Sequence, residues 1–113
     1  MVKSSAARLD GVFNALADPT RRAILESLTE RRFPVTELAH PHGMSLPGFM
    51  KHLRVLEEAG LLERSKEGRV VQCSLSAEPM REAASWLSRY EKFWTERLDA
   101  LGHYLRRQKE APQ

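Results

Sequence analysis

The segment Ser45-Leu-Pro-Gly-Phe-Met-Lys-His-Leu-Arg-Val-Leu-Glu-Glu-Ala-Gly60 decides the fold that this sequence predicts. Its opening serine is a favourable N-cap, and Pro47 loses no hydrogen bond because the amides of a first turn have no helical acceptor. Phe49, Leu53 and Leu56 follow at steps of four and three residues, which places them on one apolar face. The final glycine is typical of a helix end. The segment therefore predicts an amphipathic helix with one buried face.

The opposite face of this helix carries small, polar and basic side chains. Small residues near the N-terminal end let the backbone approach a DNA groove closely, and Lys51 and Arg54 can contact phosphates or guanine edges. We therefore predict a recognition helix that binds double-stranded DNA. Its candidate contact residues are Ser45, Leu46, Pro47, Gly48, Lys51, His52 and Arg54.

The chain before this helix completes a helix-turn-helix. Helices are expected over residues 8–17, 19–32 and 35–40. Asp18 and Pro19 are suited to the N-cap and first position of the second of these helices, and Pro34 ends it. A short helix, a glycine-containing turn over residues 41–44 and a longer helix with outward polar residues form the motif.

After Gly60 the apolar pattern changes from helical spacing to alternation. Val71, Cys73 and Leu75 alternate with more polar positions, which predicts a strand, and Gly68 suits the tight turn of a β-hairpin. Such a hairpin after a recognition helix is the wing of a winged helix-turn-helix. Its candidate DNA-contacting residues are Arg64, Lys66 and Arg69.

The last helix is expected to run from about residue 78 to residue 108. Roughly 30 residues make a rod of about 45 Å, which one domain with a radius of gyration near 13 Å cannot cover. Part of its apolar stripe should therefore contact a second copy, with help from the first helix. The predicted dimer interface contains Leu9, Val12, Phe13, Leu87, Tyr90, Trp94, Leu98, Leu101 and Leu105. An alternative is a small-ligand pocket lined by the aromatic residues of the last helix, which are Trp86, Tyr90, Phe93, Trp94 and Tyr104.

Two separated segments resemble the ArsR-type (arsenical-resistance repressor) winged-helix regulators. The recognition segment is similar to that family's Ser-Gln-Pro-Ala-Val-Ser-Lys-His-Leu-Lys-Val-Leu-Glu-Glu-Ala-Gly-Leu pattern, and Leu16-Ala-Asp-Pro-Thr-Arg-Arg-Ala-Ile-Leu25 resembles its opening signature. The resemblance implies a dimeric DNA-binding transcription factor whose wing lies along the DNA backbone. Leu46 replaces the usual Gln and Met50 the usual Ser, so these two positions either contact thymine methyl groups or form a protein-binding patch.

Composition agrees with one modest domain, expected over residues 8–108 between flexible tails at 1–7 and 109–113. The formal net charge is +3 and the pI about 9.4. One cysteine excludes an intrachain disulfide and a four-cysteine zinc site. Residues 1–8 lack the apolar region typical of a leader peptide, and no apolar run approaches the roughly 18 residues of a membrane span, so we expect a cytoplasmic protein.

The usual sensor sites of the resembled family are missing. The short helix over residues 35–40 has no thiol, and the last helix offers only Asp99 and His103, which leaves a metal site shared across a dimer as an alternative. Cys73 is expected to be a buried hydrophobe. Arg21 and Arg22 either contact phosphate or form a solvated helix face. No catalytic motif is found, so we expect neither an enzyme nor a cofactor.

These patterns together predict a mainly α, dimeric winged helix-turn-helix with a small β-hairpin. The predicted function is a metal-independent transcriptional repressor that binds an inverted repeat, either constitutively or in response to an unknown small molecule or protein. One alternative is a winged helix that has lost DNA binding and serves as a protein-interaction module. The other is a metal sensor with Asp and His ligands on the last helix.

Overall fold

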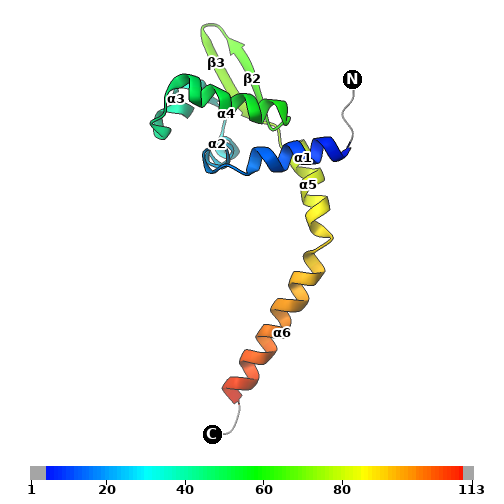
Figure 1. The fold of residues 1–113 in the computed structure, drawn as a ribbon. Coiled ribbons are helices and arrows are strands. Elements are labelled where there is room, and N and C mark those ends of the chain that lie inside the picture. Colours follow the sequence, from blue (N-terminus) through cyan, green and yellow to red (C-terminus); the bar gives the residue numbers. More distant parts are fainter. Residues whose placement is uncertain (1–4, 111–113) are drawn as a thin grey trace. The chain divides into compact units, whose positions relative to one another are not determined.

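The computed structural model describes residues 5–110, which are mainly helical with a small antiparallel sheet (Figure 1). The elements in chain order are α1 (Ser5–Leu16), α2 (Pro19–Glu30), β1 (Phe33–Pro34), α3 (Val35–Ala39), the 3-10 helix η1 (His40–His42), α4 (Leu46–Glu58), β2 (Leu62–Glu67), β3 (Val70–Leu75), α5 (Glu78–Ser88) and α6 (Glu91–Glu110). The chain divides into two compact units, Met1–Ala83 and Ala84–Gln113. The first unit is the winged helix-turn-helix that the sequence predicts.

The hydrophobic core of the first unit gathers one apolar face from each helix. Phe49, Leu53 and Leu56 of α4 are fully buried, which confirms the face predicted from their spacing. They lie with Ile24 of α2 and Val12 of α1 in the same cluster. Burial of one such side chain stabilises a fold by about 1.5–3 kcal/mol. The core therefore fixes α4 by its inner face and leaves its outer face to solvent.

The sheet has the order β1-β3-β2, with both strand pairs antiparallel. Residues Glu67 and Val70 pair across the tip of the β2–β3 hairpin, and Gly68 adopts a φ of 65° in the loop between them. A positive φ of this kind favours glycine. This hairpin is the wing, and its loop projects beyond α4 at the top of Figure 1. The short strand β1 was not expected from sequence, where Pro34 is only a helix breaker.

Several helix ends differ from the predicted ends by one to three residues. Helix α1 begins at Ser5 rather than at residue 8, and α6 continues to Glu110 rather than ending at residue 108. Residues 1–4 and 111–113 of the two expected tails lie outside the described residues. The predicted uninterrupted last helix is wrong, because α5 ends at Ser88 and α6 starts at Glu91.

A serine hydroxyl explains the interruption. The Ser88 hydroxyl donates to the Ser85 carbonyl at 2.6 Å, and that carbonyl is the acceptor that the Arg89 amide uses in a continuous α-helix. The Arg89 amide instead donates to the Trp86 carbonyl, and the Tyr90 amide to the Leu87 carbonyl. Local side-chain hydrogen bonds of this kind compete with helical ones. The helix therefore tightens into a turn and then restarts.

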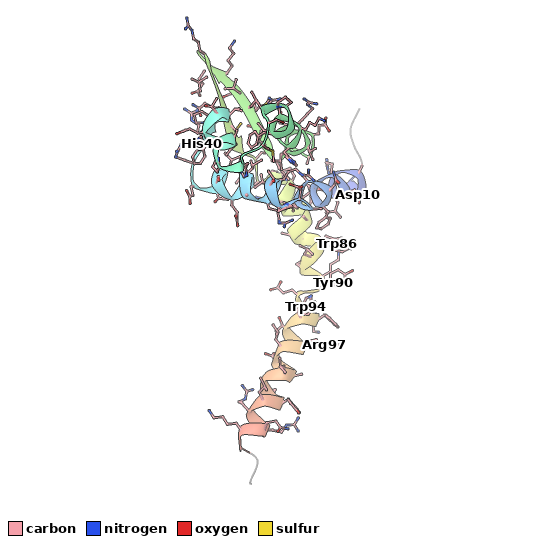
Figure 2. All side chains as sticks on the ribbon, turned by 60° about the vertical axis from the view of Figure 1, so that its left-hand side comes forward. Asp10, His40, Trp86, Tyr90, Trp94 and Arg97 are labelled. Carbon is pink, nitrogen blue, oxygen red and sulfur yellow. The ribbon has the colours of Figure 1, made fainter. Side chains whose placement is uncertain are left out.

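The second unit carries its apolar side chains at the surface. The side chains of Trp94 and Leu98 are 62% and 64% exposed, and the rings of Trp86 and Tyr90 contact each other at a tilt of 53°, with centroids 5.1 Å apart. Figure 2 labels Trp86, Tyr90 and Trp94 along this part of the chain. Nowhere in residues 5–110 is a helix both long and apolar enough to cross a membrane.

Candidate nucleic-acid interface

The N-terminal end of α4 is held by a side-chain cap. The Ser45 hydroxyl oxygen accepts the Gly48 amide at 3.2 Å, and Pro47 occupies the first turn. A Cβ at position 48 would lie 3.2 Å from that same oxygen, so glycine leaves room for the cap. The cap gives the first turn a defined backbone position, from which the amides and the positive end of the helix dipole point outward.

The outer face of α4 presents one leucine and two cations to solvent. The Leu46 side chain is 57% exposed, and Lys51 and Arg54 are exposed further along the helix. Met50, which sequence comparison placed on this face, is half-buried and packs against the core. It follows one turn after Leu46, where α4 already approaches its own domain. Of the two apolar replacements, only Leu46 therefore offers a largely free surface.

His52, a predicted DNA contact, lies instead against the start of α2. Its Nδ1 is 3.2 Å from Arg21 Nη1 and 3.8 Å from Asp18 Oδ2, and the side chain is only 22% exposed. The imidazole of His52 therefore lies within hydrogen-bond distance of the Arg21 guanidinium and close to the Asp18 carboxylate. These contacts fasten α4 to the corner between α1 and α2.

Arg21 and Arg22 cap the end of α1, a role that the sequence analysis did not anticipate. Arg21 donates to the carbonyls of Ala15 at 2.8 Å and Asn14 at 2.9 Å, and Arg22 donates to the Leu16 carbonyl at 2.8 Å. The last carbonyls of a helix lack helical donors, and cations are favourable there. The two arginines thus satisfy three carbonyls across the α1–α2 corner.

Asp18 completes this corner from the other side. Its carboxylate accepts the Arg21 amide at 3.0 Å, as the predicted N-cap of α2. That hydrogen bond is the main cause that lowers the pKa of Asp18 below 3.8. Partial burial acts in the opposite direction and raises this pKa, whereas the charges of His52 and Arg21 lower it further. The carboxylate is therefore ionised whenever the protein is near neutral pH.

The wing separates its cations into two groups. Lys66 and Arg69 are exposed near the hairpin loop, whereas Arg64 forms an ion pair with Glu57 of α4 at 2.5 Å. The Arg64 side chain is 31% exposed, so this pair joins the base of the wing to the recognition helix. Lys66 and Arg69 are consequently better placed than Arg64 to meet a DNA backbone.

The candidate sensor residues are engaged within the protein. Cys73 is completely buried in β3, and burial raises the pKa of its thiol to about 11, despite the opposing charge of Arg64. His103 Nδ1 lies 3.1 Å from the Arg106 guanidinium. Within residues 5–110 no group of three or more His, Cys, Asp or Glu side chains is placed to hold a metal ion.

These features define a winged helix-turn-helix with a basic recognition helix. A family model described as a helix-turn-helix domain matches residues 16–65. A crystallised ArsR family transcriptional regulator is 42% identical, with a TM-score of 0.74 over 84% of this chain and 97% of its own. An ArsR-like transcriptional regulator from Rhodococcus sp. RHA1 is 32% identical, with a TM-score of 0.67 over 88% of this chain and 94% of its own.

The transcriptional repressor SdpR of Bacillus subtilis is 28% identical over 70% of this chain and 88% of its own length. This chain belongs to the ArsR family of transcriptional regulators. It is a DNA-binding regulator and not an enzyme, as the sequence analysis predicts. The alternatives of a protein-interaction module and a metal sensor are not favoured by these relatives.

Proposed function

We propose that this regulator represses transcription by binding an inverted-repeat operator as a homodimer. The main support is the exposure of four cations on one compact unit. Lys51 and Arg54 lie on α4, Lys66 and Arg69 lie on the wing, and α4 packs against β2. Cations from two elements can neutralise phosphates on both sides of a groove. The likeness to a relative named a transcriptional repressor supports repression.

The residues of the proposed interface have different tasks. Ser45, Pro47 and Gly48 bring the start of α4 close to the groove floor, and Lys51 and Arg54 contact base edges or phosphates. Lys66 and Arg69 contact the DNA backbone. His52 and Arg64 position α4 and the wing through the contacts that they make within the protein.

Exposed apolar side chains of the second unit support a homodimer. Trp94, Leu98, Leu101 and Leu105 recur at steps of four, three and four residues, and each is at least half exposed. Leu87 and Tyr90 extend this set towards α5. Of the α1 residues predicted for the interface, Val12 is only 1% exposed and is covered by its own core, so the proposal retains the half-buried Leu9 and Phe13. Such a surface is typical of an interface.

We also propose that the regulator acts in the cytoplasm and without a metal ion. Support comes from its single cysteine, which is buried and protonated at neutral pH, and from the Asp99 and His103 pair, whose histidine nitrogen faces Arg106. Soft metals require accessible thiolate ligands. An unidentified small molecule or protein remains the proposed signal.

Selection of bound duplexes from a random pool tests the DNA proposal. We expect an inverted repeat whose half-sites lie about one helical turn, roughly 34 Å, apart. Arg54→Ala or Lys51→Ala should weaken binding by about 1–3 kcal/mol if the residue contacts a base, and the base preference at one position of the operator should then be reduced. The matched variant Arg69→Ala should weaken all duplexes alike and lower the salt dependence. Enrichment of no motif at moderate salt would refute the proposal.

Sedimentation at micromolar concentration tests the dimer. The double variant Trp94→Lys with Leu98→Lys should be monomeric. It should lose tight binding to a full inverted repeat, because a monomer contacts one half-site without a linked second subunit on the other. Lys92→Ala, on the same helix but outside the apolar stripe, is the control and should remain dimeric. A wild-type monomer that protects both half-sites would contradict the proposal.

A further inference from the structure

The first turn of α4 lacks the side chains with which recognition helices usually bind base edges. Between Ser45 and Lys51 stand Leu, Pro, Gly, Phe and Met, none of which has a conventional hydrogen-bonding side chain. The Ser45 oxygen already accepts the Gly48 amide. The five residues after the cap can therefore discriminate between bases with their side chains only through shape and apolar contact.

Leu46 is the side chain available for such a contact. It follows the N-cap directly and remains 57% exposed, whereas Phe49 is fully buried and Met50 is half-buried against the core. The N-terminal residues of a recognition helix are those that approach base edges. Leu46 therefore occupies the position where a base contact is made, with no partner inside its own unit that covers it.

The surroundings of Leu46 favour a nucleic acid over a protein as its occupant. The same face of α4 continues into the exposed cations Lys51 and Arg54, which complement a polyanion. The only other large exposed apolar residue at this end is Met44, at 36%. Two side chains form too small an apolar surface for a protein interface of ordinary size.

One apolar group is displayed on base edges in the major groove, the C5-methyl group of thymine. We propose that Leu46 packs on a thymine methyl in each operator half-site and thereby makes the regulator select thymine at that position. This inference rests on the proposed function, and it adds the base and the atom that the first turn of α4 recognises. Gly48 and Pro47 assist because neither has a long side chain that would hold the helix away from the groove.

The test replaces thymines of the selected operator by deoxyuridine, one symmetric pair at a time. This change removes the methyl group and keeps every hydrogen-bonding group of the base. Replacement of one symmetric pair of thymines should weaken binding about tenfold, because the loss of each buried methyl group weakens it roughly threefold to fourfold. Leu46→Ala should bind the thymine and uracil operators equally. Met44→Ala is the matched control and should keep the full preference for thymine.

A third variant separates contact from DNA shape. Leu46→Gln restores an amide that can pair with adenine N6 and N7, so a repeated selection should shift that position from thymine to adenine. If every uracil operator binds wild-type protein as well as thymine does, the inference is wrong while the proposed function stands. It is equally wrong if Leu46→Ala retains the uracil effect. If no duplex is selected at all, the proposed function itself has failed.

Discussion

Replacement of Arg21 by alanine should destabilise the fold far more than replacement of its neighbour Arg22. Arg21 donates to the carbonyls of Ala15 and Asn14 and lies 3.2 Å from His52 Nδ1, and the first and last of these contacts are partly buried. Arg22 makes one exposed hydrogen bond, to the Leu16 carbonyl. The pair differs in environment but not in side-chain type, so each variant is the control for the other.

The magnitude follows from the number and exposure of the contacts. A hydrogen bond from a charged donor contributes about 1.5–3 kcal/mol, and exposed ones contribute less because water replaces the lost partner. One partly buried carbonyl bond and two weaker contacts give about 2–3 kcal/mol for Arg21→Ala. The single exposed bond gives under about 1 kcal/mol for Arg22→Ala. At about 4–8 °C per kcal/mol, the expected loss of Tm is about 10–20 °C for Arg21→Ala and under 8 °C for Arg22→Ala.

Thermal and urea unfolding at one fixed protein concentration measure this difference, since dimerisation makes Tm depend on concentration. Operator binding is then measured at a temperature where both variants are folded. Arg22→Ala should bind nearly as wild type. Two variants of equal and nearly normal stability that both lose operator affinity would refute the capping role and favour a phosphate contact for the arginine pair.

Three further predictions concern metal ions, the Cys73 thiol and the Asp18 carboxylate. Zinc, cadmium and arsenite at micromolar concentration should leave the affinity of a preformed operator complex within about twofold, since soft ions need thiolate ligands; a tenfold loss that Asp99→Ala or His103→Ala abolishes would overturn this. Cys73 should resist iodoacetamide at pH 8 in the native protein and react on unfolding, because burial raises the pKa of its thiol to about 11. The pKa of Asp18 in the folded protein lies below its ordinary value, so its contribution to stability is present above about pH 4 and is lost as the pH falls through that lower pKa. The variant Asp18→Asn should keep most of the helix cap at pH 7. Its stability in urea unfolding should depend less on acid pH than that of the wild type.

Sequence patterns predicted the helix-turn-helix because its determinants are local. The serine cap, the spacing of Phe49, Leu53 and Leu56, and the glycine of the hairpin act within a few residues, so the printed sequence contains the cause. The break between α5 and α6 was missed for a different reason. Its apolar spacing continues from Leu87 through Tyr90 to Trp94, and the turn depends on a single local contact, the hydrogen bond from the Ser88 hydroxyl to the Ser85 carbonyl.

Charge is the property that sequence places least well, because a cation at a helix end is equally suited to a carbonyl, a carboxylate or a phosphate. The sequence around the interface offers eight candidates: Arg21, Arg22, Lys51, His52, Arg54, Arg64, Lys66 and Arg69. Folding engages four of them, since the two arginines of α2 cap α1, His52 contacts Arg21 and Arg64 pairs with Glu57. These four orient α4 and the wing. We therefore propose that the other four, two on α4 and two on the wing, set the electrostatic part of DNA affinity, and that the engaged ones act on it through the position of the elements that they hold.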